Sequence, residues 1–191
     1  MNSKHDRMPP LALESLDALQ RAAADALIAG PRKAVKGPFI ALLRSPQLLA
    51  PLQAAGEYLR FGSALPRRVS EFATLVVPRH WSQQFEWQVH VPLARQAGTG
   101  ADTLEGLRQG LRPATMSAEE AFVHDFVVEL ATRRGVADAT YAEAIQRFGE
   151  RGVVDLVGLI GYFTLMSMVL NVAGTPAGDT PDVASLPPPA S

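Results

Sequence analysis

The sequence predicts an all-α protein of one domain, in which about seven helices surround one long apolar helix. Apolar residues recur at helical spacing over most of the chain, and Pro, Gly and capping residues separate these stretches. No segment shows the alternation of apolar and polar residues that is typical of a half-buried strand. The 191 residues, 47% of them hydrophobic, are enough for one domain with its own core.

The first two helices have clear end signals. Residues 16–27 carry apolar side chains every three or four positions, and Gly30-Pro31 stops this run. A loop rich in Gly, Pro and basic residues follows over 30–38. Ser45-Pro46 is a typical cap followed by proline in the first helical turn, and the helix that it opens is expected to end at Gly62.

The next two helices each contain a proline. Pro66 opens one helix, and we expect Pro78 to kink or end it near Val77. Ser82 can cap the following helix, which reaches Ala97. Pro92 lies inside this stretch, so the sequence predicts a kink or break around His90.

Four helices are expected in the second half of the chain. They are a short helix over 102–109, a helix that begins at the capping box Ser117-Ala-Glu-Glu120, a helix over 138–148 and a last helix over 153–172. The last helix is apolar nearly all round and should therefore be central. Its uncharged stretch, 156–170, is shorter than the roughly 20 residues of a membrane span, so we expect no membrane partner.

The chain divides into three parts. Residues 1–10 form an N-terminal extension without an apolar signal core, and 11–173 form the helical domain. Residues 174–191 hold five prolines, so this tail cannot be helical; it is either disordered or laid on another subunit. A cytoplasmic location is the default expectation.

Charge and cysteine content exclude several functions. The formal net charge of −1 argues against a nucleic-acid partner or a polybasic membrane contact. Because the chain has no cysteine, it has no disulfide, thiolate metal site, iron–sulfur cluster, cysteine nucleophile or dithiol redox centre of its own.

One pair of residues points to a functional site. Glu86 and His90 lie one turn apart on the same face of their helix, and Gln83 precedes Glu86 by a turn. Burying such groups without a partner costs several kcal/mol. Three interpretations are open on spacing alone: an acid/base site, a structural ion pair, and a metal site completed by Glu71 or His80. Because no second His-containing pair has ligand spacing, we expect no metal.

Several segments resemble the carboxymuconolactone decarboxylase family, which is related to the alkylhydroperoxidase D-like proteins. The similarity covers Arg68 to Glu71, His80-Trp81 and the run from Glu86-Trp87 through His90 to Gly98. Residues 37–46, 148–154 and 161–171 are similar to longer bacterial members. This resemblance implies an all-helical, alkylhydroperoxidase D-like fold and a homo-oligomer, a trimer or a hexamer.

The resemblance also implies which branch of the family is closer. In the peroxidase branch a Glu precedes a Cys-x-x-Cys, and a His follows four residues after the second Cys. Here Glu71 and His90 match the Glu and the His, but Gln83 and Glu86 stand at the cysteine positions. Thiol peroxidase chemistry is therefore lost. The decarboxylase branch has a Glu four residues before the His, acts on a carboxylated muconolactone and needs no metal or organic cofactor.

The expected function is acid/base chemistry on a small carboxylated lactone or related acid. His90 would be the general acid/base, Glu86 its orienting partner and Glu71 a second proton-transfer group. Arg68, if not a solvated surface residue, would hold a substrate carboxylate. The remaining candidates for substrate contact are Gln83, Trp87, His80 and Tyr162.

The alternative is a non-catalytic, homo-oligomeric protein that binds a small molecule or acts as an accessory module. Its basis is that the chain has no nucleophile, metal cage or cofactor motif. The two hypotheses differ in one structural respect, which is whether Glu71, Glu86 and His90 converge on a cavity that solvent can enter. A dry and fully paired trio would favour the non-catalytic protein.

Overall fold

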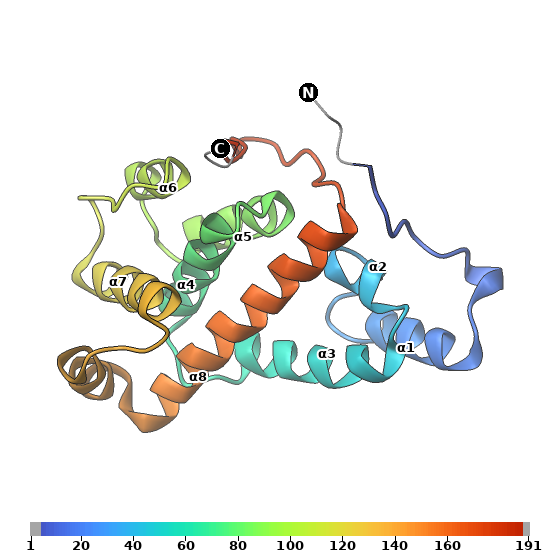
Figure 1. Ribbon diagram of the computed structural model, residues 1–191, viewed down its shortest axis with the longest axis horizontal. Helices are drawn as coiled ribbons and strands as arrows, with labels where there is room; N and C mark the ends of the chain where they lie inside the picture. Colours follow the sequence, from blue (N-terminus) through green and yellow to red (C-terminus); the bar gives the residue numbers. More distant parts are fainter. Residues whose placement is uncertain (1–4, 189–191) are drawn as a thin grey trace.

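The computed structural model describes residues 5–188, and over this range the protein is helical without strands, so the all-α prediction is confirmed (Figure 1). The elements are a 3₁₀ turn at Leu13–Ser15 and the helices α1 (Ala18–Ala29), α2 (Pro38–Leu42), α3 (Pro46–Phe61), α4 (Arg67–His80), α5 (Gln84–Gln96), α6 (Ala101–Arg108), α7 (Ala118–Arg133) and α8 (Asp138–Ala173).

The long helix α8 is the centre of the fold. It changes direction at Gly149, whose φ of 65° and ψ of 173° are not helical, so its two segments match the two separate helices expected from the sequence. The second segment runs diagonally across the molecule, with α4 to α7 on one side and α1 to α3 on the other (Figure 1). Its contacts with α2, α3 and α4 bury Leu156, Leu159, Met166 and Leu170 almost completely.

An apolar window of α8 is long enough to cross a membrane by length and composition, with a mean hydropathy of 2.0. Of this window, 56% is buried inside the protein. Burial of this part is typical of a core helix, whose inward apolar face is covered by neighbouring helices.

Helix α4 connects the core to the other side of the molecule. It packs against α5, α7 and α8, and every residue from Val69 to Pro78 is buried. The polar residues among them, Ser70, Glu71 and Thr74, therefore have to find partners inside the protein. The expected capping box of α7 is present, since the Ser117 and Glu120 side chains each accept a hydrogen bond from the other's backbone N–H.

Pro78 and Pro92 do not end their helices, and one short helix was not predicted. Helix α4 passes Pro78 and ends at His80, and α5 continues through Pro92 without a break at His90. A proline costs one backbone hydrogen bond but leaves the helical φ intact, and the burial of α4 and α5 against each other outweighs that loss. Helix α2 was not expected, because its five residues are too few to show periodicity.

The C-terminal tail lies on the protein's own surface, where the sequence predicted disorder or contact with another subunit. Residues 175–188 are not helical, and they run above α5 toward α6 (Figure 1). The Trp87 indole N–H donates to the Ala184 carbonyl at 3.1 Å, the Leu186 N–H donates to Gln84 Oε1 at 2.9 Å, and the Leu186 side chain is buried. Hydrogen bonds between the tail backbone and two side chains of α5 thus hold the extended tail in place. Residues 1–4 and 189–191 of the extension and the tail lie outside the described range.

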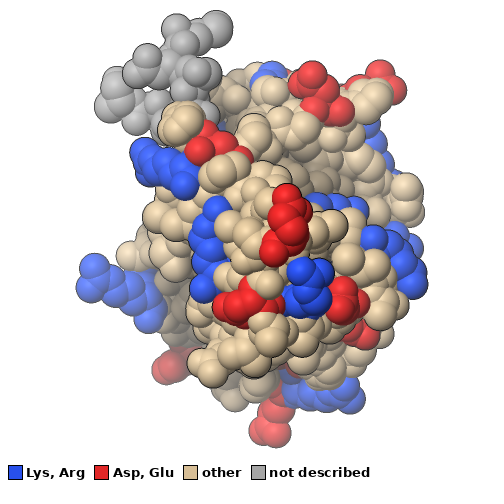
Figure 2. All heavy atoms as spheres, turned by 90° about the vertical axis from the view of Figure 1, so that its right-hand side faces the viewer, with Lys and Arg blue, Asp and Glu red and all other residues tan. Residues whose placement is uncertain are grey.

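The described part of the N-terminal extension contacts the C-terminal end of α8. The Arg7 backbone N–H donates to the Ala173 carbonyl at 2.7 Å, so the extension and the tail meet at the C-terminal end of this helix. On the face that lies at the right of Figure 1, basic and acidic side chains are interspersed (Figure 2). This pattern accords with the formal net charge of −1.

Candidate active site

His90 is held between two carboxylates in the interior. Its Nδ1 lies 2.9 Å from Glu71 Oε2, and its Nε2 lies 3.5 Å from Glu86 Oε2. The exposed fractions of Glu71, Glu86 and His90 are 9%, 5% and 4%. The trio that the sequence singled out is therefore brought together, with Glu71 contributed by α4 and the other two by α5.

The local structure of the α4–α5 connection fixes this geometry. Glu86 and His90 are one helical turn apart, so their side chains share a face. Gln83 caps α5, because its side-chain oxygen accepts from the Glu86 N–H at 3.1 Å. The same connection is fastened to α8 by the Asn171 amide, which donates to the Trp81 carbonyl at 3.0 Å. Packing of α5 on α4 then brings Glu71 to the other edge of the imidazole.

The charges of the two carboxylates favour the protonated imidazole. Burial alone would lower the pKa of His90, but the hydrogen bonds to Glu71 and Glu86 outweigh it and raise this pKa above its usual value of about 6.5. His90 is therefore held toward the imidazolium form at neutral pH. In that form Nδ1 is hydrogen-bonded to Glu71, and Nε2 has the Glu86 carboxylate at an ion-pair distance of 3.5 Å.

A cavity of about 290 Å³ opens beside His90, and we call it the His90 cavity. His90 and Glu86 are on its wall, whereas Glu71 is not and lies behind the imidazole. The other lining residues are Arg32, Lys36, Pro38, Phe39, Arg60, Phe85, Val89, Leu93, Tyr162, Phe163 and Met166. Apolar and aromatic walls with a few polar groups are typical of small-molecule sites.

Aromatic residues of α8 complete the wall. The Phe163 ring lies edge-to-face with the imidazole of His90, with centroids 5.1 Å apart, and Tyr162 packs against Phe163 in the same way at 5.4 Å. These contacts fix the plane of the imidazole. Burial raises the pKa of the Tyr162 hydroxyl, so this group stays protonated and can donate a hydrogen bond.

The remaining predicted residues are placed elsewhere, except Tyr162. Trp87 is buried and binds the tail, and Gln83 is buried and caps α5. Arg68 pairs with Glu120 at 3.2 Å and does not line the His90 cavity. His80 is exposed at the end of α4 and lines different cavities. The structure thus does not bring Arg68, His80, Gln83 or Trp87 to the cavity wall.

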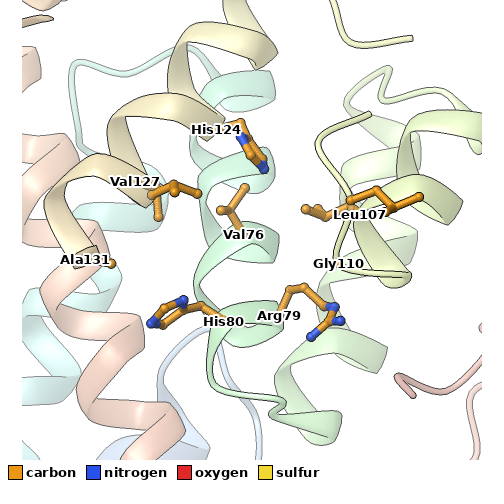
Figure 3. Close-up of a pocket in the computed structure, with 10 residues that line it drawn as sticks. Val76, Arg79, His80, Leu107, Gly110, His124, Val127 and Ala131 are labelled. Atoms are coloured by element: carbon orange, nitrogen blue, oxygen red, sulfur yellow. The ribbon is translucent and has the colours of Figure 1, made fainter. Parts of the chain in front are cut away.

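His80 belongs to a second cavity, of about 240 Å³, that lies between α4, α6 and α7 and that we call the His124 cavity. Figure 3 shows Arg79 and His80 at one end and His124 at the other, with Val76 and Val127 between them. Arg79 Nε donates to the Arg108 carbonyl at 2.9 Å, and His124 Nδ1 lies 3.1 Å from Asp125.

Sequence reasoning missed the basic residues of the His90 cavity, which are Arg32, Lys36 and Arg60. The basic loop over 30–38 was visible in the sequence, but nothing in its spacing connects it to His90. Within residues 5–188, no group of three or more His, Asp or Glu side chains has the arrangement of a metal site.

Neither a protein-family model nor a curated protein matches this chain. Solved structures do share its fold. An uncharacterized peroxidase-related protein from Silicibacter sp. TM1040 aligns with a TM-score of 0.72 and 17% identity over 93% of this chain and 95% of that one. An uncharacterized peroxidase-related protein from Ralstonia eutropha JMP134, described as an alkylhydroperoxidase AhpD core, aligns with a TM-score of 0.71 and 17% identity over 91% and 92%. The chain therefore has the AhpD-like helical fold.

Proposed function

We propose that the protein is a cofactor-independent acid/base enzyme of the carboxymuconolactone decarboxylase type, acting on a small carboxylated lactone or a related acid. The observation that carries this proposal is the position of His90, which lies between two buried carboxylates and on the wall of a cavity. A histidine with this environment can deliver a proton to a bound molecule at neutral pH.

The geometry supports roles for the two carboxylates that differ from those expected from the sequence. Glu71 is closer to the imidazole and lies off the cavity wall, so we assign it the orienting role at Nδ1. Glu86 shares the cavity wall with His90, so it is the group that exchanges a proton with His90 Nε2 or with a ligand. A fixed Nδ1–H leaves Nε2 as the reacting atom.

The proposed reaction is a decarboxylation. The bond between the substrate's ring carbon and its carboxylate breaks, CO₂ leaves, and the electron pair passes into the conjugated lactone carbonyl. The imidazolium of His90 then protonates the resulting dienolate at carbon, and a proton from solvent restores the imidazolium through Glu86. The mostly apolar cavity strengthens the interaction between the imidazolium and the anionic intermediate.

This function is tested by a substrate screen followed by one substitution. A set of carboxylated lactones and dienoic acids is screened by thermal shift, and compounds that bind are assayed for CO₂ release. His90→Ala should abolish turnover while the helical circular dichroism is retained, and an unchanged rate would refute the assignment. An assay with an alkyl hydroperoxide should be flat, since the chain has no cysteine. Binding without turnover by the unmodified protein would favour the non-catalytic alternative.

We further propose that the protein is a cytoplasmic homo-oligomer, a trimer or a hexamer. Support comes from apolar side chains that α8 leaves uncovered, with Val154 and Val172 exposed by 70% and 60%. Association would bury this surface. Light scattering at micromolar concentration tests the proposal, and a monomer would contradict it.

A further inference from the structure

Two arginines face the same cavity as His90 from other elements. Arg32 follows α1, and Arg60 is in the last turn of α3. Both are partly buried, and among residues 5–188 neither has a carboxylate within ion-pair distance. Partly buried guanidinium groups without an anion are unusual, because removal from water is offset mainly by a paired charge.

The donors of these arginines are incompletely used. The Nε of Arg60 is buried and has no hydrogen-bond partner in the described part of the chain. The Arg32 guanidinium makes one long hydrogen bond, from Nη2 to the Tyr162 hydroxyl at 3.4 Å. It stacks over the Phe39 ring at 4.2 Å from the centroid, which holds its plane without satisfying its donors. Glu57, which is exposed beside both arginines, makes no ion pair with either of them.

The backbone makes room for this arrangement at one glycine. A Cβ at Gly56 of α3 would overlap the Tyr162 hydroxyl and would lie 3.0 Å from Arg32 Nη2. Only glycine therefore lets Tyr162 and Arg32 approach α3 so closely. Glycine in a helix interior costs about 0.5–1 kcal/mol relative to alanine, so its presence fits a close approach that alanine would prevent.

We infer that Arg32 and Arg60, together with the Tyr162 hydroxyl, form a carboxylate-binding subsite in the His90 cavity. This inference deepens the proposed function and rests on it. The two guanidinium groups supply the donors that a carboxylate accepts, and Lys36 adds positive charge on the same wall. A carboxylate held there orients the rest of the ligand toward His90 and Glu86, which share the cavity. The volume of about 290 Å³ suits an acid with a single ring.

We assign to Arg32 and Arg60 the role that the sequence suggested for Arg68, which is to bind a substrate carboxylate. That residue already has a carboxylate partner, Glu120, at 3.2 Å. Arg32 and Arg60 lack such a partner among residues 5–188, and this difference favours them as the binding groups. Because guanidinium geometry matters for a planar carboxylate, lysine at these positions should replace arginine only in part.

The inference is tested by binding, independently of turnover. The probes are 5-oxotetrahydrofuran-2-carboxylate, a lactone with one carboxylate, and its uncharged carboxamide, with affinities measured by calorimetry. The unmodified protein should bind the acid at least about tenfold more tightly than the amide, as charge-assisted hydrogen bonds require. Arg32→Gln and Arg60→Gln should each remove most of this preference, and Arg32→Lys should keep part of it.

The matched control is Arg68→Gln, which should leave the preference for the acid unchanged. Equal affinity of the unmodified protein for acid and amide, or no detectable binding of the acid, would overturn the inference. So would an unchanged preference in the Arg32→Gln, Arg60→Gln double variant. His90→Ala should retain binding of the acid and lose only turnover. If the unmodified protein proves inactive but its preference for the acid depends on the two arginines, the proposed function fails and the subsite stands.

Discussion

The His90 cavity and the His124 cavity have similar volumes, about 290 and 240 Å³, and each contains histidine and arginine side chains. They differ in how their charges are paired. On the wall of the His124 cavity, Arg79 donates to a backbone carbonyl, and His124 lies 3.1 Å from Asp125. Asp125 itself is off the wall and half exposed, and it accepts two hydrogen bonds of 2.8 Å from Arg112. The charges of this cavity are satisfied by groups near the surface.

At the His90 cavity two buried carboxylates converge on one imidazole, one from the wall and one from behind it. Within residues 5–188, the arginines of the wall have no carboxylate at ion-pair distance. Histidine and arginine side chains in a cavity are therefore not enough to identify it as a functional site. What distinguishes the His90 cavity is a buried proton donor with a fixed orientation, next to cations whose donors are free for a ligand. Each of the following predictions tests one part of this difference.

The largest effect is expected from the carboxylate that shares the cavity wall with its histidine. Glu86→Gln should lower kcat about 100-fold, because it removes the group that we assign to proton exchange with His90 Nε2. The matched change is Asp125→Asn, which removes the charge beside His124 of the other cavity and should leave kcat unchanged. Equal losses in the two variants would remove the functional distinction between the cavities. The measurement is steady-state turnover of a substrate found in the screen.

The next effect concerns Glu71 and should depend on pH. The pKa of His90 is raised in the folded protein, so its stabilising contribution is full below the unfolded value of about 6.5 and is lost as the pH rises through the folded value. Glu71→Gln keeps a hydrogen-bond acceptor but removes the charge. It should cost about 1–3 kcal/mol of unfolding free energy at pH 6, and the cost should shrink at high pH.

Urea unfolding of both proteins between about pH 6 and pH 9.5 measures this difference. The control is Glu105→Gln, which removes an exposed partner of Arg108. Hydrogen bonds from Arg108 hold the pKa of Glu105 at about 2, so the effect of this change should be constant over the range. A cost of Glu71→Gln that does not vary with pH would mean that His90 does not titrate against Glu71.

The third prediction tests the close approach of Tyr162 and Arg32 to Gly56 of α3. Gly56→Ala places a methyl group where the Tyr162 hydroxyl lies, so it should lower stability by about 1–3 kcal/mol and weaken binding of the lactone acid. Gly161→Ala on α8 is the matched control, since its Cβ meets nothing within 4 Å. That change should stabilise the helix by about 0.5–1 kcal/mol. Thermal unfolding measures both, and equal effects would show that the space at Gly56 has no special use.

The sequence predicted the fold well because local signals mark most of the helices. The capping box of Ser117 and Glu120 marks the start of α7. The two helices expected over 138–148 and 153–172 correspond to the two segments of α8, which meet at Gly149. Of the alternatives offered for the prolines at 78 and 92, an end or break of the helix was wrong, since local rules do not include the packing of α4 against α5. The position of the tail also depends on tertiary contacts, namely its hydrogen bonds to Trp87 and Gln84 of α5 and Arg108 of α6.

The site was predictable only in part. Helical spacing alone placed Glu86 beside His90, whereas the contact with Glu71, 19 residues earlier, was suggested by resemblance to a family. Arg32 and Arg60 come from a loop and a helix that have no sequence relation to α5, and only the tertiary fold brings them to one cavity. Arg68 is close to Glu71 in sequence and was expected to bind a substrate carboxylate, but its guanidinium forms an ion pair with Glu120.

The smallest effect is expected at the half-exposed ion pair next to His124. Arg112 and Asp125 form a pair of ideal geometry, yet both side chains are about half exposed, with 55% and 51% accessible. Hydrogen bonds from Arg112 lower the pKa of Asp125, but solvent and salt screen such a pair. Arg112→Gln should therefore shift the midpoint of thermal unfolding by little more than the error of the measurement, and added salt should remove what remains. A loss as large as that of Glu71→Gln would mean that burial does not separate the two cavities, and the assignment of function to the His90 cavity would lose its physical basis.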